Sequence, residues 1–415
     1  MITRAVRVLG WLALFVAPGV ARADEPRPHR LTPAEVADGW IALCDGAKLF
    51  GWRPGGVEDA AAAWRVEDGT IVRDGGPPGL LLTTSEFADF ELRCGVRVEA
   101  GGNSGLFLRT LAEPADPARD CYEFNVCDTH GAFPTGSLVG IAKPTVAVAG
   151  DGRWLACRVR CEGRSIRAWL DDREVLDFTD DRPAARRRGY IGLQFKEGAV
   201  AFRDVLLRPL GAAPLVNGRD LAGWHEVPGG AGRFTVVDGA IHVTGGRGFL
   251  ETDGTWGDFI LQARARTNAP GLNSGIFFRA IRGTAAEPAN GYEVQIHNGF
   301  SDGDRTRPAD FGTGGIYRRV PARRVVGDDG AWQTLTLVAC GRHVATWVDG
   351  EQVVDWTDDR AAADNPRKGA RTAAGHVSLQ GHDPTTDLDF RDLTIAELPA
   401  EVDGVSEPVG VSSPR

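Results

Sequence analysis

The sequence predicts an all-β protein built from two tandem antiparallel β-sandwich domains. Short apolar or alternating runs rich in Val, Ile, Phe and Trp are separated by Gly and Asp turns, as in antiparallel β proteins. The second half of the chain repeats the first, with a unit of about 170 to 185 residues that is far longer than a solenoid repeat or a propeller blade. A length of 415 residues suits two domains of ordinary size.

The repeat is clearest in three pairs of segments. NSGLFLR, from Asn103, corresponds to NSGIFFR, from Asn273, and CYEFNVCDT, from Cys121, corresponds to GYEVQIHNG, from Gly291. IRAWLDDREVLDFTDDR in the first half corresponds to VATWVDGEQVVDWTDDR in the second, with hairpin turns expected at Asp-Gly. These matches predict domain 1 at 40–210 and domain 2 at 213–398, and the short join suggests that the domains pack against each other.

The two ends of the chain are expected to lie outside these domains. Two arginines precede an apolar run, Val8–Val20, and Ala21-Arg22-Ala23 follows it, so residues 1–23 are predicted to be a cleaved export signal. The run is shorter than the roughly 20 residues that cross a bilayer, so no membrane span is expected. The mature protein is predicted to be periplasmic or extracellular. The tail at 399–415, which has no periodicity, is predicted to be disordered.

Charge and cysteine content narrow the possible functions. The net charge of the chain is -9, and an acidic exported protein is a poor candidate for binding nucleic acid. Six of the seven cysteines precede residue 165. An odd number of cysteines concentrated in one half of the chain is not typical of a disulfide framework. Cys157 and Cys161, on the apolar side of the strand LACRVRC, are predicted to be free core thiols.

A polar row in GYEVQIHNG is the main candidate site. Because successive side chains of a strand point to opposite faces, Glu293, Gln295 and His297 share one face. By the same alternation Arg279 of NSGIFFR, on the expected neighbouring strand, can stand beside Glu293. The alternative is a solvated face with a surface Arg-Glu pair, worth at most about 1 kcal/mol.

Other residues could extend this face. Trp347 could offer an aromatic platform, and His382, in a Gly-rich turn just past a strand, could reach over the sheet. A long polar segment follows GYEVQIHNG, and long loops in compact domains are commonly functional or disordered. Within it Asp302 and Asp304 could join His297 around a divalent cation. DGD does not complete a calcium-loop signature, so no metal or other cofactor is assigned.

Domain 1 keeps only part of this pattern. It retains Glu123 but has Asn125 and Cys127 where domain 2 has glutamine and histidine, and Phe195-Lys196 where domain 2 runs on to its second histidine. His130, three residues past Cys127, could partly substitute. Because domain 1 lacks the two-imidazole arrangement, its site is predicted to be degenerate and any chemistry is expected in domain 2.

Both copies resemble the 3-keto-disaccharide hydrolase domain family, which includes 3-keto-glucoside 1,2-lyases and hydratases. In the second copy the resemblance lies in NSGIFFR, GYEVQIHNG, GTGGIY, WQTLTLVACGRHVATWVDG and LQGHDPTTDLDFRDLTI. In the first it lies in DGAKLFGW, NSGLFLR, CYEFNVCDTHGAFPTGSLVG and WLDDREVLDF. Together the matches cover nearly all of residues 40–398. The resemblance implies a concanavalin-like jelly roll in each copy, and chemistry on a sugar oxidised at carbon 3.

On such a sugar the ketone acidifies the proton on carbon 2, so its removal can expel the glycosidic oxygen from carbon 1. Addition of water then completes a net hydrolysis. This route needs a base, an acid and donors for the enolate. The residues that fit these needs are His297 or Glu293 as the base, His382 as the acid, Arg279 with Asn273 as enolate and hydroxyl contacts, and Gln295 and Trp347 as further substrate contacts.

Two other functions stay open. The first is a non-catalytic, lectin-like carbohydrate-binding pair in which Trp347 and Trp169 stack on sugar rings. The second is a structural module of a cell-surface assembly. In the enzyme hypothesis the partner is a carbohydrate substrate, and a sugar 3-dehydrogenase could supply it.

Overall fold

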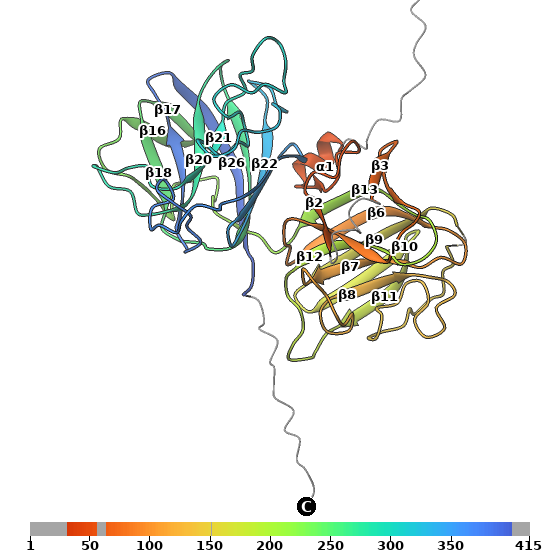
Figure 1. Cartoon of the computed structure of the whole chain (residues 1–415). Helices are drawn as coiled ribbons and strands as arrows, with labels where there is room; N and C mark the ends of the chain where they lie inside the picture. The colour runs from red at the N-terminus through yellow and green to blue at the C-terminus, as the bar shows by residue number, and fades with distance from the viewer. Residues whose placement is uncertain (1–30, 56–63, 151, 401–415) are drawn as a thin grey trace, which may run out of the picture.

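In a computed structural model the chain folds into two β-sandwiches, each made of an eight-stranded and a five-stranded antiparallel sheet (Figure 1). The structure describes residues 31–55, 64–150 and 152–400. The predicted all-β architecture of two tandem sandwiches is confirmed. The predicted export signal, and the tail beyond residue 400, lie outside the described residues. Within the described ranges no helix is long and apolar enough to cross a membrane.

Domain 1 contains strands β1 to β13. Its large sheet has the order β11-β10-β9-β6-β13-β4-β3, with β1 also paired to β13, and its small sheet has the order β2-β5-β12-β7-β8. The strands are β1 (Ile41–Ala42), β2 (Trp52–Gly55), β3 (Arg65–Glu67), β4 (Thr70–Arg73), β5 (Gly79–Thr83), β6 (Phe90–Val98), β7 (Ser104–Thr110), β8 (Tyr122–Val126), β9 (Leu155–Glu162), β10 (Ser165–Leu170), β11 (Arg173–Thr179), β12 (Tyr190–Phe195) and β13 (Val200–Pro209).

Domain 2 repeats this topology. Its large sheet has the order β16-β17-β26-β19-β22-β23-β24, with β14 paired to β26, and its small sheet has the order β15-β18-β25-β20-β21. The strands are β14 (Ala213–Pro214), β15 (Trp224–Glu226), β16 (Gly232–Val237), β17 (Ala240–Gly245), β18 (Gly248–Thr252), β19 (Phe259–Thr267), β20 (Ser274–Ala280), β21 (Tyr292–Ile296), β22 (Gln333–Cys340), β23 (His343–Val348), β24 (Glu351–Thr357), β25 (His376–Gly381) and β26 (Thr386–Glu397).

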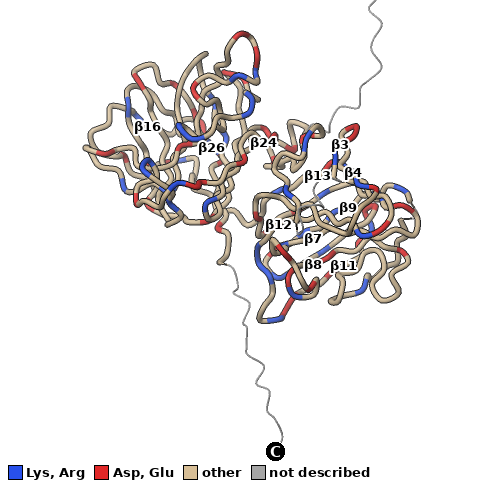
Figure 2. The backbone as a smooth tube through the Cα atoms, viewed as in Figure 1, with Lys and Arg blue, Asp and Glu red and all other residues tan. Residues whose placement is uncertain are grey.

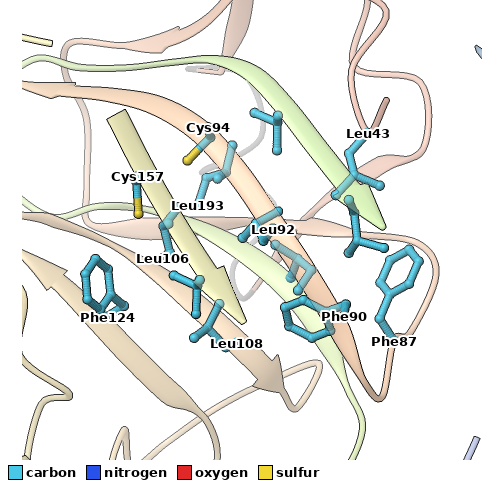
Figure 3. Packing of buried hydrophobic residues seen from close by; sticks show 14 of the residues in the cluster. Leu43, Phe87, Phe90, Leu92, Cys94, Leu106, Leu108, Phe124, Cys157 and Leu193 are labelled. Atoms are coloured by element: carbon cyan, nitrogen blue, oxygen red, sulfur yellow. The ribbon is translucent and has the colours of Figure 1, made fainter. Parts of the chain in front are cut away.

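Alternating side chains from the two sheets fill the core of each sandwich. Figure 3 shows part of the domain 1 core, where Cys94 of β6 and Cys157 of β9 lie close together among leucine and phenylalanine side chains. These two cysteines are directly opposed in the strand register. Cys157 and Cys161 are free and buried, which confirms the prediction of free core thiols.

The two lobes meet at an interface that includes a short helix, α1 (Pro33–Ala37), which lies at their junction (Figure 1). This helix was not predicted from the sequence, and its first turn is held by a capping box between Thr32 and Glu35. Across the interface, Gln262 Nε2 donates to the carbonyl of Gly39 at 2.8 Å. Elsewhere basic and acidic residues are interspersed over both lobes, as Figure 2 shows.

Trp347 is part of this interface, which contradicts its predicted role as a sugar platform. Its side chain is only 1% exposed and belongs to the same apolar cluster as Ile41 and Leu43 of domain 1. The indole Nε1 donates to the carbonyl of Ala42 at 3.0 Å. Alternation correctly assigned Trp347 to the outer face of its sheet, but domain 1 covers that face.

Candidate active site on the small sheet of domain 2

The polar row of β21 lies on the outer face of the five-stranded sheet. Val294 packs in the core with its neighbours Tyr292 and Ile296, so Glu293 and Gln295 point away from the core, as predicted. They are nevertheless only 5% and 1% exposed. The row is therefore a covered polar surface, and the alternative of an ordinary solvated face does not hold for these two residues.

The cover comes from the long segment that follows β21. Its residues run along the free edge of β21, where Gln295 N donates to Gly315 O at 2.8 Å and Tyr317 N donates to Glu293 O at 2.9 Å. Ile316 between them is buried in the core, so alternation turns Tyr317 toward the outer face. The ring of Tyr317 is half-buried and lies 5.3 Å from that of Phe311. These rings, rather than Trp347, are the aromatic groups near the polar row.

Glu293 lies on this face on the edge strand β21. A Cβ at Gly275 on the neighbouring strand would be 2.8 Å from the Cγ of Glu293, so the glycine leaves room for the glutamate side chain. Arg367 Nη2 donates to the carboxylate at 3.0 Å. Burial raises the pKa of Glu293, while the charges of Arg367 and His382 act in the opposite direction and Asp310 adds to the increase. These charged groups therefore act on one carboxylate.

Asp310 organises the amide side chains next to Glu293. Gln295 Nε2 donates to the backbone carbonyl and to Oδ2 of Asp310 at 2.9 and 2.8 Å, and Asn273 Nδ2 donates to Oδ2 at 2.5 Å. Because two acceptors hold the Gln295 amide nitrogen, the orientation of the amide is fixed. Its Oε1 is buried and has no hydrogen-bond partner among the described residues, and the same is true of Gln380 Oε1.

The strand register brings these two unpaired oxygens to the same part of the sheet. Gly275 is opposite Gln295 in the pairing of β20 with β21. Ile276 is opposite Leu379 in the pairing of β20 with β25, which sets Gln380 beside Gly275 on its other side. A buried acceptor without a partner is unfavourable. The two oxygens therefore mark a position where hydroxyl groups of a ligand could bind.

The two predicted histidines lie at one end of this face. His297 Nδ1 faces the carbonyl of Leu272 at 3.1 Å. A carbonyl only accepts hydrogen bonds, so Nδ1 carries the proton and Nε2 is the acceptor in the neutral ring. His382 is 41% exposed in its side chain, and its Nδ1 lies 2.9 Å from Asp383 Oδ2. Hydrogen bonds from Thr385 and His382 lower the pKa of Asp383 to about 2.

Arg279 does not stand beside Glu293, which contradicts the prediction. It adopts a φ of 48°, and the pairing of β20 with β25 shifts register between Phe277 and Ala280. This irregularity breaks the alternation on which the prediction depended. The guanidinium is buried and forms an ion pair with Asp258 at 3.0 Å. It also donates to three backbone carbonyls, those of Gly257, Gly341 and Arg371.

The residues proposed for a cation are not assembled. Asp302 forms an ion pair with Arg307, and Asp304 accepts hydrogen bonds from the backbone and side chain of Thr306 at 2.9 and 2.7 Å. In the part of the chain that the structure describes, no group of three or more His, Cys, Asp or Glu side chains could hold a metal ion.

The structure also contains a cavity of about 870 Å³ between the two domains. Its lining includes Phe50, Arg264 and Trp332, and it contains none of the predicted site residues. It is therefore separate from the face that carries Glu293.

Of the seven predicted site residues, the structure brings five to the outer face of the small sheet or its end: Asn273, Glu293, Gln295, His297 and His382. Sequence reasoning missed Asp310, Tyr317, Arg367 and Gln380. Asp310 and Tyr317 lie in the long loop whose length had indicated a function, and Gln380 follows the same alternation as Glu293. Arg367 lies in a segment after DDR that is longer in domain 2 than in domain 1.

Residues 39–208 and 211–396 each match the sequence profile of a family described as the 3-keto-alpha-glucoside-1,2-lyase-like domain. The chain belongs to this family. Over 79 residues it is 38% identical to the 3-keto-disaccharide hydrolase of Bacteroides thetaiotaomicron, a match that spans 17% of this chain and 27% of that protein. The match thus spans about a quarter of the relative's length.

Solved structures with similarity to this family member align with roughly one domain's share of the chain. A candidate glycosyl hydrolase from Parabacteroides distasonis is 21% identical, with a TM-score of 0.39, covering 43% of this chain and 98% of that one. The carbohydrate-binding module CBM66 from Bacillus subtilis is also 21% identical, with a TM-score of 0.29, covering 38% and 95%.

Proposed function

We propose that domain 2 cleaves 3-keto-α-glucosides by elimination followed by addition of water. The observation that carries this proposal is the buried Glu293. Its carboxylate reaches toward Gly275, the glycine flanked by Gln295 and Gln380 with their unpaired amide oxygens, and the charge of His382 acts on it. A base of raised pKa, a nearby imidazole and open hydrogen-bond acceptors are what proton removal next to a sugar ketone requires. Membership of the family supports a sugar oxidised at carbon 3 as the substrate class.

In the elimination step Glu293 takes the proton from carbon 2. The electron pair forms a double bond between carbons 1 and 2, the bond from carbon 1 to the glycosidic oxygen breaks, and His382 gives a proton to the leaving oxygen. Arg367 is suited to the enolate oxygen, because its guanidinium is cationic and its buried Nε has no hydrogen-bond partner among the described residues. Gln295 and Gln380 accept hydrogen bonds from the sugar hydroxyls.

In the hydration step His297 accepts a proton from water through Nε2 while the oxygen adds to carbon 1. Glu293 returns its proton to carbon 2, so the net reaction is hydrolysis. His382 has lost one proton and His297 has gained one, and exchange with solvent restores both rings. Histidine suits these roles because its unperturbed pKa is about 6.5.

An ordinary two-carboxylate glycosidase is less well supported. Glu251 shares the outer face with Glu293, but the strand registers place Ser378 and Phe277 between them. Three strand spacings correspond to about 14 Å, whereas the paired carboxyl groups of glycosidases lie about 5 to 10 Å apart. Asp310 is held by two amide donors in a separate role.

The test is release of the free sugar from a 3-keto-disaccharide and from its unoxidised parent by the full chain. We expect turnover of the ketone only, and a loss of about 10²- to 10⁴-fold in Glu293→Gln. His297→Gln should still release the leaving group but should accumulate the unsaturated sugar. Asp302→Asn, in an exposed loop outside the site, is the control and should leave turnover unchanged. Equal cleavage of the parent, or full activity of Glu293→Gln, would refute the proposal.

The second candidate is a lectin-like binder. It is favoured by the unpaired oxygens of Gln295 and Gln380 and by the half-buried ring of Tyr317, since hydroxyl acceptors and an aromatic face also suit pure sugar binding. Binding of the parent disaccharide without turnover of either sugar would favour this function.

Export is part of the same proposal. We expect the mature protein to begin at Asp24, after the predicted signal at 1–23, and to receive its substrate from a sugar 3-dehydrogenase. N-terminal sequencing of the protein recovered from the periplasm or medium checks the first point.

A further inference from the structure

The small sheet of domain 1 repeats the centre of the site in domain 2. Gly105 is opposite Asn125, and Phe107 is opposite Glu123, in the pairing of β7 with β8. Glu123 is buried, and its Oε1 accepts a hydrogen bond from Gln194 Nε2 at 3.0 Å. Burial raises the pKa of Glu123, as it does that of the equivalent carboxyl in domain 2. The Ser104 hydroxyl donates to the backbone carbonyl of Gln194 at 2.6 Å, and in domain 2 a serine hydroxyl donates to the backbone carbonyl of the equivalent glutamine at 2.7 Å.

Domain 1 also keeps two unpaired amide oxygens. Asn125 Nδ2 donates to the carbonyl of Phe133 at 2.5 Å, and Gln194 Nε2 is held by Glu123. The orientation of each amide is therefore fixed by its acceptor. Gln194 Oε1 and Asn125 Oδ1 are buried and have no hydrogen-bond partner in the described ranges of the chain. These are the same two positions that carry unpaired oxygens in domain 2, so both copies present acceptors around a glycine.

The groups that move protons in domain 2 are replaced in domain 1. Lys196 occupies the position of His382, and buried Cys127 that of His297. Val139 N donates to the backbone carbonyl of Glu123 as Tyr317 N donates to that of the glutamate in domain 2, so Val139 corresponds to Tyr317. Counting back along the matched loops places Ala132 at the position of Asp310.

His130 does not restore the arrangement of domain 2. It contributes electrostatically to Glu123, but its Nδ1 accepts a hydrogen bond from the backbone of Phe133 at 3.0 Å. The imidazole that domain 2 places after β25 is replaced by a lysine here. Domain 1 thus keeps the hydrogen-bonding centre and lacks the histidine pair.

We propose that domain 1 is a second carbohydrate site, which binds a neutral glycoside through Glu123, Asn125 and Gln194 without cleaving it. The ligand class is a neutral sugar with adjacent hydroxyl groups, because the open groups are acceptors and hydroxyls are the donors that satisfy them. The class of ligand rests on the proposed function, whereas the location rests on domain 1 alone. A tethered binding site would keep a saccharide chain close to domain 2 by raising its effective concentration.

The test is calorimetric titration of the full chain with trehalose, a neutral, unoxidised α-glucoside disaccharide. We expect two molecules bound per chain. Gln194→Leu should leave one site, Gln380→Leu in domain 2 is the matched variant and should also leave one, and the double variant should leave none. Asn125→Ala is a second domain 1 variant, and the thermal unfolding of each protein checks that it folds.

A wild-type stoichiometry of zero would overturn the inference, as would one or two sites that neither Gln194→Leu nor Asn125→Ala affects. The inference that domain 1 does not cleave its ligand would be wrong if Glu293→Gln kept turnover of a 3-keto-disaccharide and the additional change Glu123→Gln abolished it. The two proposals can fail separately. A trehalose site that Gln194→Leu removes, without any turnover, would leave this inference standing and refute the proposed reaction. Turnover of the ketone without a trehalose site that depends on Gln194 would do the reverse.

Discussion

Replacing Trp347 by alanine tests whether this residue stabilises the domain interface or, as the sequence suggested, binds sugar. The side chain is buried between the domains, and its indole nitrogen donates to Ala42 O. Trp169 is the matched residue in domain 1. It is 9% exposed and is covered by Arg158, whose guanidinium carbon lies 3.8 Å from the ring centroid. The two tryptophans therefore occupy equivalent strand positions with different neighbours.

The expected losses of stability differ accordingly. Truncating a buried tryptophan to alanine costs about 3 to 5 kcal/mol, and leaving the Ala42 carbonyl without its donor adds about 1 kcal/mol. We therefore expect Trp347→Ala to lower the free energy of unfolding by about 4 to 6 kcal/mol. Trp169→Ala should lose less, about 1 to 3 kcal/mol, because flexible arginine side chains can close over the gap.

The assay is urea denaturation of both variants, followed by two probes, together with sugar binding by the folded proteins. Trp347→Ala should also separate the unfolding of the two domains, because its ring contributes to their interface. A loss below about 1 kcal/mol, combined with weaker sugar binding, would refute this reasoning and restore the predicted aromatic platform.

Three further predictions concern buried charge. Because burial raises the folded-state pKa of Glu123 above its unfolded value, ionisation destabilises the fold as the pH rises through the folded pKa. Glu123→Gln should therefore be more stable than the wild type at pH 7, and the difference should vanish below the ordinary glutamate pKa; a difference that grows toward acid would contradict this sign. Glu293→Gln should gain less stability at pH 7 than Glu123→Gln does, because it leaves Arg367 without its carboxylate. Thermal unfolding of both variants across a pH range measures these differences. Arg279→Lys should lose about 3 kcal/mol in urea denaturation, since an ammonium cannot reach the four groups that the guanidinium binds; a loss under about 1 kcal/mol would mean that the ion pair is dispensable.

Period-two alternation predicted much of the site, because β21 is a regular strand over its whole length. It assigned Glu293 and Gln295 to one face and Val294 to the core, as the structure has them. The same rule failed at Arg279, where a positive φ and a register shift interrupt the count. Nothing in the local residue pattern of NSGIFFR distinguishes a strand with such an irregularity from one without it.

The other differences arise from tertiary contacts. Trp347 was correctly assigned to an outer face, but only the placement of domain 1 makes that face an interface. Asp310 and Arg367 come from irregular segments, so no periodicity could place them next to β21. What the sequence did provide was the length of the loop that contains Asp310, and a long polar loop is a common location of functional residues.

Comparison of the two copies also shows which motif residues support the fold. The arginine of NSGIFFR is a buried anchor, and its counterpart Arg109 in NSGLFLR has the same left-handed backbone and makes an ion pair with Asp89 at 2.9 Å. The tyrosine of GYEVQIHNG donates to Asp358 at 2.7 Å, and the tyrosine of CYEFNVCDT donates to Asp180 at 2.6 Å. These shared residues are explained by the sandwich itself, whatever either domain binds.

Chemical differences between the domains must then come from the positions that the sandwich leaves unconstrained. Those are the residue after β25, which is His382 or Lys196, the residue after β21, which is His297 or Cys127, and the loop position that is Asp310 or Ala132. Exchanging the first of these, with Lys196→His in domain 1, would add an imidazole beside Glu123 but would not supply the missing aspartate. Because the proposed hydration also needs an imidazole to take the proton from water, and Cys127 stands at that position, this single change should leave domain 1 without net hydrolysis.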